Sequence, residues 1–121
     1  MLMVNLSMIK GRIVLVPFPF DDLSASKVRP AVCLANPIGP HRHVIISFIS
    51  SRIPAELLET DLMLDSTKDD FSKTGLRVSS TIRLHRLMTV TTSLFQRELG
   101  ELPPHIQEEV DNRLSKLFDL K

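Results

Sequence analysis

Short apolar runs separated by polar, turn-forming residues make up most of this chain. Runs of roughly four to eight residues rich in Val, Ile, Leu and Phe, bounded by Gly, Pro, Asp and Ser, are typical of β-strands. Pro17 and Pro19 cannot donate a hydrogen bond to a neighbouring strand, so the first strand must leave the sheet, bulge or lie at an edge there. The pattern predicts strands near Arg12–Phe18, Pro30–Ala35, His43–Ser50, Asp61–Leu64, Ser80–His85 and Leu94–Leu99.

The last part of the chain changes to a helical period. Its apolar residues recur at three- and four-residue steps, which gives one apolar stripe along a helix. Proline is tolerated in the first turn, and acidic residues follow near the positive end of the helix dipole. We therefore expect a helix from about His105 to Leu120 that packs on the strands through Ile106, Val110, Leu114, Leu117 and Phe118.

Two segments between the strands follow neither period. The segment Ile53–Leu58 predicts a short helical turn, and the polar segment Ser66–Gly75 predicts a loop.

With 121 residues, 43% of them hydrophobic, the chain is long enough for one globular domain with its own core. The expected fold class is mainly β with one C-terminal helix.

Charge is segregated along the chain, although the net charge is only +1. Residues 1–52 carry six Lys or Arg against two Asp, and residues 71–97 carry five against no acid. Residues 56–70 and 98–111 are acidic. Folding can gather the two basic segments on one face, where they would attract phosphates whatever the total charge. The alternative for each single Lys or Arg is ordinary solvated surface charge.

The single cysteine and the lengths of the apolar runs indicate the cellular compartment of the protein. Cys33 lies in an apolar run, where a buried, inert thiol is expected, and a lone cysteine excludes an internal disulfide and suits a reducing compartment. Residues 1–7 lack the positive start and the long apolar run of a signal peptide. No run approaches the roughly 20 apolar residues of a membrane span. We expect a cytoplasmic protein that does not bind a membrane.

The segment Gly11–Asn36 is the most informative part of the chain. Its apolar runs flank a polar loop that ends in Lys27 and Arg29. A positively charged side chain at the start of a strand, beside a polar loop, is better suited to binding an anion than to packing in a hydrophobic core. The order of residues is specific: Gly11, Ile13–Phe20, the loop Asp21–Lys27, and Val28-Arg29-Pro30-Ala31.

This order resembles the MazF/PemK family of bacterial toxins, small ribonucleases that cut messenger RNA. Further pieces follow in the family's order: Val44–Ser51, Gly75-Leu76, Ser80–Leu87 and Leu94–Leu102. The resemblance covers roughly residues 8 to 120. Residues 1–7 are therefore expected to be an N-terminal extension, and residues 8–121 a single toxin domain.

The resemblance implies a fold and partners. The family's fold is a small SH3-like β-barrel of the MazF/PemK/CcdB type with a C-terminal helix, and it works as a homodimer. Such a protein would be the toxin of a type II toxin–antitoxin system. Its antitoxin would have an acidic, disordered tail that lies across the active face, and the complex with the antitoxin would bind DNA.

RNA cleavage needs no metal, which fits the residue types present. The sequence has no CxxC or HExxH motif and no clustered Asp residues, so metal-dependent hydrolysis lacks ligands and no cofactor is expected. His41 and His43 have no third ligand nearby and are expected to be solvated loop residues. The 2′-hydroxyl of RNA can itself attack the adjacent phosphate, given a base, an acid and donors to the phosphorane.

Arg29 and Ser50 are the first candidates for this chemistry. A guanidinium matches phosphate oxygens, a hydroxyl can donate to them, and the resemblance places the family's activity at these two positions. Ser50 replaces the commoner Thr. We predict Arg29 as phosphate clamp and proton donor and Ser50 as phosphorane stabiliser. The alternatives are an ion pair of Arg29 with Asp21 or Asp22, and a turn at Ser51–Arg52 that is capped by Ser50.

Arg83 and His85 are the second candidates. They lie two apart on a predicted strand and so share one face. PemK-like members of the family carry an Arg-x-Asp here, and His85 takes the place of the Asp. Because histidine titrates near neutral pH, we predict His85 as the base. The alternative is that Arg83 pairs with a surface carboxylate and His85 is half-exposed.

Other residues are predicted to hold the RNA. The chain has no Trp or Tyr, so we expect recognition by hydrogen bonds more than by base stacking. The expected RNA-binding residues are Lys27, Ser51, Arg52, Phe18 and Phe20.

Three functions compete. The first is a metal-independent, sequence-selective endoribonuclease that cleaves single-stranded mRNA by 2′-hydroxyl attack. The second is a non-enzymatic poison of the same fold, like the gyrase-binding CcdB-type toxins. The third is an SH3-type peptide-binding module, which needs an aromatic-lined groove that this chain is poorly equipped to build. The basic loop and the pair of Arg29 and Ser50 favour the first.

Overall fold

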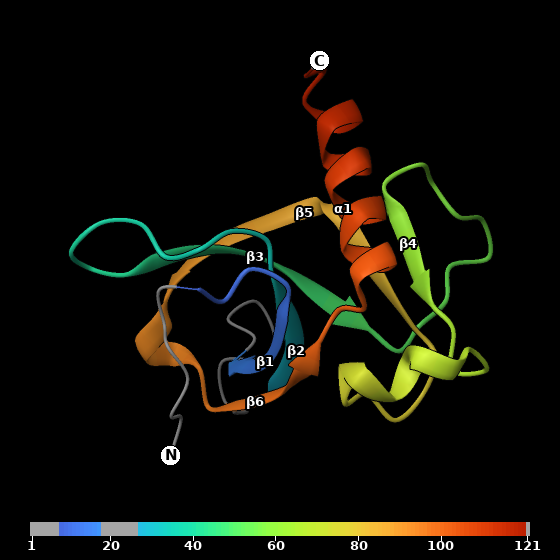
Figure 1. Cartoon of the computed structure of the whole chain (residues 1–121), viewed down its shortest axis with the longest axis horizontal. Coiled ribbons are helices and arrows are strands. Elements are labelled where there is room, and N and C mark those ends of the chain that lie inside the picture. Colours follow the sequence, from blue (N-terminus) through green and yellow to red (C-terminus); the bar gives the residue numbers. More distant parts are fainter. Residues whose placement is uncertain (1–7, 18–26, 121) are drawn as a thin grey trace.

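A computed structural model describes residues 8–17 and 27–120, which form one curled antiparallel sheet and a C-terminal helix (Figure 1). The sheet order is β4-β5-β3-β2-β1-β6, and every neighbouring pair is antiparallel. The predicted fold class is confirmed. The elements are β1 (Arg12–Pro17), β2 (Val28–Cys33), β3 (His43–Ser50), β4 (Asp61–Leu64), η1 (Asp69–Thr74), β5 (Ser80–Thr91), η2 (Thr92–Leu94), β6 (Arg97–Glu101) and α1 (Pro104–Leu117).

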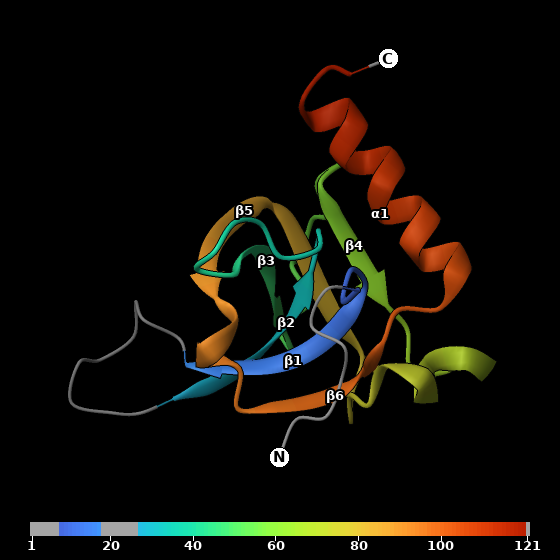
Figure 2. The ribbon, with the colours of Figure 1, turned by 60° about the vertical axis from the view of Figure 1, so that its left-hand side comes forward.

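A sharp bend in β5 curls the sheet. Ser47 of β3 pairs with Leu87 and Ile49 pairs with Ile82, so residues 83–86 of β5 lie opposite a single residue of β3. Extra residues on one strand of an antiparallel pair bend that strand and increase its twist. Inside the bend, the buried hydroxyl of Ser47 donates to the carbonyl oxygen of Arg83 at 2.9 Å. Figure 2 shows β5 as an arc over the sheet.

Apolar side chains are buried on both faces of the sheet. Ile13 and Val32 belong to the cluster that Val110 of α1 joins, whereas Val14 and Ala31 belong to a second cluster. Successive residues of a strand point to opposite faces. Burial on both sides therefore explains the uninterrupted apolar runs 13–16 of β1 and 31–33 of β2.

The helix α1 is fixed to the edge of the sheet by Arg113. Its Nη1 donates to the carbonyl oxygens of Glu59 and Asp61, both at 2.8 Å, and its Nε pairs with Glu109 at 2.7 Å. The helix begins one residue before the predicted start and ends at Leu117. Within residues 8–17 and 27–120, no helix is long and apolar enough to cross a membrane.

The two predictions for segments between the strands differ from the structure. The segment Ile53–Leu58 contains a bend at residues 55–56 and no helical turn, so the predicted helical turn is wrong. Its two leucines are about half exposed, at 48% and 49%, and without burial a single helical turn is not stable. The predicted loop Ser66–Gly75 contains the 3-10 helix η1, which is anchored by the buried Thr74 and ends at Gly75 in the left-handed region.

Candidate functional site

Arg29 and Ser50 come from the neighbouring strands β2 and β3. Ala31 lies opposite Phe48, where the pairing of β2 with β3 ends, and Arg29 and Ser50 each lie two residues further along their strands. Alternate residues of a strand share one face, so Arg29 lies on the face of Ala31 and Ser50 on the face of Phe48. The two candidates therefore lie on the same face, at the same end of these neighbouring strands.

The Ser50 hydroxyl has a defined hydrogen bond. Its Oγ accepts from the backbone N–H of Arg52 at 3.0 Å, so Ser50 caps the turn that follows β3. The bond uses a lone pair of the oxygen and leaves the O–H hydrogen able to donate elsewhere. Ser50 is half-buried, which keeps this hydroxyl within reach of a ligand at the surface.

A pocket of about 300 Å³ opens beside Arg29. Three arginines line it, Arg29 from β2, Arg77 from the segment before β5 and Arg97 from β6, and no acidic residue of the described part of the chain belongs to its lining. The sequence prediction did not name Arg77 and Arg97 as site residues. Their signal was the acid-free segment 71–97, whose fold brings two of its five basic residues to this pocket.

The predicted RNA-binding residues are divided around this pocket. Ser51 lines it, whereas Lys27 and Arg52 are exposed residues near the same ends of β2 and β3. Phe18 and Phe20 lie outside the described residues. The structure therefore gathers Arg29, Ser50 and Ser51 at one end of the sheet.

Arg83 lies elsewhere, in an ion pair with Asp61 of β4. Its Nε donates to Asp61 Oδ1 at 2.8 Å and its Nη2 to Oδ2 at 3.3 Å, and the Asp61 side chain is fully buried. The backbone N–H of Leu58 also donates to Asp61 Oδ2, at 2.9 Å. Burial acts to raise the pKa of Asp61, but the hydrogen bonds from Arg83 and Leu58 outweigh it and hold that pKa below its usual value.

His85 lies in the bend of β5 and is exposed. Its Nδ1 lies 2.9 Å from Thr60 Oγ1, next to the ion pair of Arg83 and Asp61. Neither Arg83 nor His85 belongs to the lining of the arginine pocket. The structure thus brings Arg83 and His85 near each other but does not place them in the pocket with Arg29.

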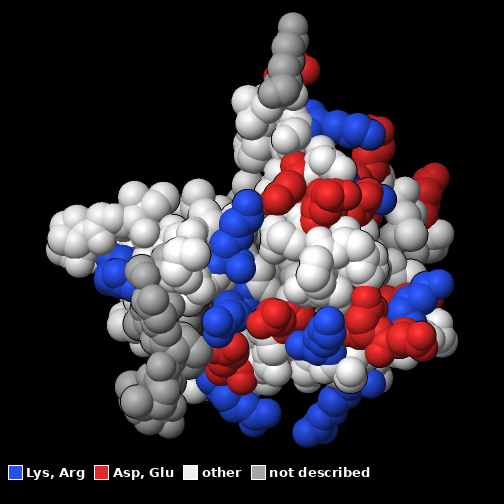
Figure 3. All heavy atoms as spheres, viewed as in Figure 1, with Lys and Arg blue, Asp and Glu red and all other residues white. Residues whose placement is uncertain are grey.

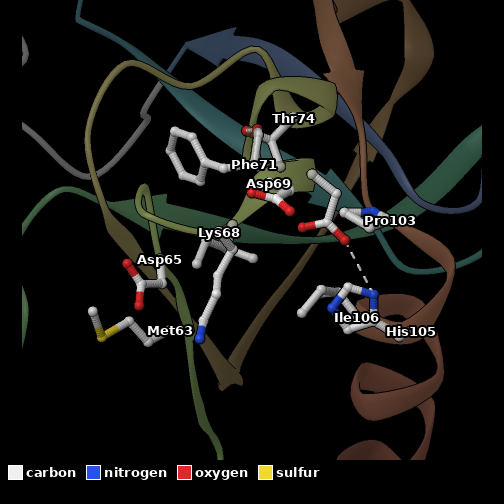
Figure 4. A pocket seen from close by; sticks show the side chains of 11 residues that line it. Met63, Asp65, Lys68, Asp69, Phe71, Thr74, Pro103, His105 and Ile106 are labelled. Carbon is white, nitrogen blue, oxygen red and sulfur yellow. Dashed lines mark hydrogen bonds and ion pairs between the residues drawn. The ribbon is translucent and has the colours of Figure 1, made fainter.

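A second cavity, of about 340 Å³, lies between β4, η1 and the start of α1. Its lining includes Asp65, Asp69 and Asp70 against one lysine, Lys68. Figure 4 shows His105 of α1 reaching Asp70, with Nδ1 and Oδ2 3.3 Å apart. Because carboxylates repel phosphates, this cavity suits RNA less well than the arginine pocket does.

Other reactive side chains lie away from both cavities. Burial raises the pKa of Cys33 to about 12, so the thiol stays protonated and is a poor nucleophile at neutral pH. The rings of His41 and His43 stack, with centroids 5.9 Å apart. Among the described residues, no group of three or more His, Cys, Asp or Glu side chains is placed to hold a metal ion.

The charge on the visible face is mixed. Figure 3 shows acidic side chains gathered over α1, and basic and acidic side chains interspersed below it. The acids of α1 are Glu108, Glu109 and Asp111, so the helix presents a negative surface apart from Arg113 and Lys116. This face is therefore not uniformly basic, whereas the described lining of the arginine pocket carries three arginines and no acid.

Bacterial toxins share this combination of a curled sheet and a C-terminal helix. The Mycobacterium tuberculosis toxin MazF-mt6 has a TM-score of 0.68 at 20% identity, covering 91% of this chain and 98% of that chain. An endoribonuclease in complex with its cognate antitoxin, from a mycobacterial species, has a TM-score of 0.66 at 13% identity, with 94% and 97% covered. MazF from Deinococcus radiodurans gives 0.65 at 16% identity, with 97% and 100% covered. At such identities the likeness establishes the fold.

The sequence itself identifies the family. A family described as the PemK-like, MazF-like toxin of type II toxin–antitoxin systems matches residues 9–118, and the chain belongs to this family. The resemblance inferred from Gly11–Asn36 is thereby confirmed. None of the curated protein sequences matches the chain at a significant level.

Proposed function

We propose that this protein is a metal-independent endoribonuclease that cleaves single-stranded mRNA, as the toxin of a type II toxin–antitoxin system. The observation that carries the proposal is the position of Arg29, which lies on the same face and at the same end of the sheet as Ser50 and lines a pocket with two further arginines. Membership of the toxin family supports it. So does the fold likeness to structures described as endoribonucleases.

The chemistry requires few protein groups. The 2′-hydroxyl oxygen of RNA forms a bond to the adjacent phosphorus, and the bond from phosphorus to the 5′-oxygen breaks. The Arg29 guanidinium would bind the phosphate oxygens as a fork and serve as donor to the leaving oxygen. The Ser50 hydroxyl would donate to the phosphorane, which carries more negative charge than the starting phosphate.

Attack by the 2′-hydroxyl also requires a base that takes its proton. His85 is our candidate because a neutral imidazole can accept a proton near neutral pH. It lies in the bend of β5, so this role requires the RNA to extend from Arg29 past the end of β3. A matching role for Arg83 would require it to leave Asp61, to which it is bound through two nitrogens.

We also propose two partners. One is an antitoxin with an acidic, disordered tail that would cover Arg29 and the arginine pocket. A structural relative was solved with its cognate antitoxin, which supports this partner. Because the contact would be largely electrostatic, it should weaken as salt concentration rises. The other partner is a second copy of the chain.

The test is incubation of the purified protein with a long single-stranded RNA in excess chelator. We expect discrete cuts from the parent and a loss of roughly 10²–10³ in rate for Arg29→Ala, which removes a preorganised donor to the transition state. Arg86→Ala is the matched control, because Arg86 is exposed on β5 and outside the pocket lining. Intact RNA with the parent would instead support the non-enzymatic poison, and unchanged cleavage by Arg29→Ala would remove the central claim.

A further inference from the structure

Two glycines hold the segment that carries Arg77 against the strand that carries Arg97. Gly75 has a φ of +73°, and a Cβ there would collide with the carbonyl oxygen of Leu99. A Cβ on Gly100 would collide with the carbonyl oxygen of Lys73. Only glycine lets the two backbones approach this closely. The wall of the pocket between η1 and β6 is therefore built at a fixed spacing, with one arginine on each side.

The positive charge of this wall has no acidic counterpart in the described part of the chain. Arg77 and Arg97 are exposed, and neither forms an ion pair with a carboxylate of residues 8–17 or 27–120. By contrast, Arg12, Arg83 and Arg113 pair with Glu98, Asp61 and Glu109. The two pocket arginines therefore keep their hydrogen-bond donors available for a ligand from outside.

The rest of the lining is mostly apolar. Leu15 of β1 pairs with Pro30 on one side and with Arg97 on the other, so these three residues form a row across the sheet. Ile49 and Leu99 line the same pocket. An apolar surface beside guanidinium groups is complementary to a nucleotide, because a nucleotide has a flat base that can cover the apolar surface and a phosphate that can bind the guanidinium groups. An acidic peptide side chain would use the arginines but would leave the apolar surface uncovered.

We propose that Arg77 and Arg97 form a second phosphate-binding subsite next to Arg29, which holds a nucleotide of single-stranded RNA adjacent to the cleaved one. The inference rests on the proposed function for the identity of the chain that is bound. The two guanidinium groups bind one backbone phosphate from opposite sides of the pocket, and the base lies over Leu15 and Pro30. Arg77 and Arg97 act in binding and positioning, whereas Arg29 acts on the reacting phosphate.

The experiment measures binding separately from cleavage. The probe is a single-stranded RNA with 2′-O-methyl groups throughout, which has no free 2′-hydroxyl and is not cut. We expect Arg77→Gln and Arg97→Gln each to weaken binding roughly tenfold, the effect of losing a charge-assisted hydrogen bond. Each should also lower the slope of log K against log salt by about 0.7, the value for one phosphate contact on a single strand. Arg86→Gln, the matched control, should leave affinity and slope unchanged.

Cleavage kinetics provide the second readout. With unmodified RNA as the substrate, the double variant Arg77→Gln/Arg97→Gln should have a strongly raised KM. Its kcat at saturating RNA should change little, because Arg29 and Ser50 are intact. Circular dichroism checks the fold, which exposed Arg→Gln changes should preserve.

Three outcomes would overturn the inference, and a further one would contradict only the proposed function. Unchanged probe affinity and salt slope in the double variant would remove the subsite, and cleavage by the parent would then leave the proposed function standing. A parent that binds the probe through Arg77 and Arg97 but never cuts RNA would instead contradict only the proposed function. If the variants lost affinity for a poly-glutamate peptide and kept it for the RNA probe, the pocket would be a site for an acidic protein segment. A loss of kcat equal to that of Arg29→Ala would make the two arginines part of the catalytic step, not a binding subsite.

Discussion

Ser50 has a geometry that allows both roles that its sequence position left open. It caps the turn after β3 by accepting from the N–H of Arg52 at 3.0 Å, and the same hydroxyl keeps its hydrogen for donation. A cap fixes the position of the oxygen before any ligand binds. That preorganisation is what a donor to a transition-state oxyanion requires.

Substitutions at Ser50 should separate these roles. We expect Ser50→Ala to slow RNA cleavage less than Arg29→Ala does and to cost about 0.5–1.5 kcal/mol in the free energy of unfolding, the net value of one hydrogen bond. Ser50→Thr keeps the hydroxyl and should retain both properties. Urea unfolding and cleavage rates measure the two effects, with Ser115→Ala on α1 as a control for serine removal. A Ser50→Ala enzyme with the parent's rate would show that the hydroxyl only caps the turn.

By the resemblance drawn from the sequence, His85 stands at the position expected to carry an Asp. If His85 accepts the 2′-hydroxyl proton, removing its ring nitrogens must slow the cleavage step. We expect His85→Gln to lose most of the rate, and His85→Asp to recover part of it. Initial cleavage rates of the three proteins measure this. Equal rates of the parent and His85→Gln would make His85 a bystander held by Thr60.

At the level of elements, the bend of β5 and the start of β4 are joined by a buried charge. Asp61 accepts from Arg83 and from the backbone of Leu58, while Arg113 of α1 donates to the carbonyl oxygen of the same residue. One residue thus connects β4, β5 and α1. A buried carboxylate is tolerated because its oxygens are satisfied by hydrogen bonds.

Removing this carboxylate should lower stability in a pH-dependent way. Asp61 has a depressed pKa in the folded state, so its contribution is present above the unfolded value of about 3.9 and is lost as the pH falls through the folded value. We expect Asp61→Ala to lower the free energy of unfolding by about 3 kcal/mol at pH 7 and by clearly less at pH 3. Denaturant unfolding at both pH values measures this, with the exposed Glu56→Ala as control. An equal loss at pH 3 and pH 7 would contradict the assignment.

At the level of the whole molecule, the far end of α1 stands out from the sheet (Figure 1). Leu117, Phe118 and Leu120 are 37%, 54% and 65% exposed there. Clustered exposed apolar side chains mark contact sites more often than they mark ordinary surface. We propose a second copy of the chain as the partner that covers them.

We expect a homodimer in solution whose stability depends on this end of α1. Sedimentation at micromolar concentration should give twice the 13.7 kDa of one chain. Phe118→Glu should shift the equilibrium towards monomer, because a charge would have to be buried in the interface. Ile38→Glu is the matched control, since Ile38 is 60% exposed in a distant hairpin. A parent that sediments only as a monomer would contradict the dimer.

The sequence alone predicted those features that depend on local pattern. The bounds of β3 and β4 were predicted as the structure has them, because a short apolar run and the polar residues at its ends are local features of the sequence. The family was identified from Gly11–Asn36, and the candidates Arg29 and Ser50 follow from that identification. The second half of β5 was missed because its pairing with β3 depends on the bend at 83–86, which no local pattern marks.

Only the tertiary structure decided which basic residues meet. Arg29, Arg77 and Arg97 are far apart in sequence, and the charge pattern favoured none of them over Arg83 or Arg86. In the folded chain, Arg83 pairs with the buried carboxylate of Asp61, whereas Arg77 and Arg97 line the same pocket as Arg29. The physical reason is that charge along a chain is a local property, whereas ion pairing and pocket formation depend on strand order and on the close approach of backbones at Gly75 and Gly100.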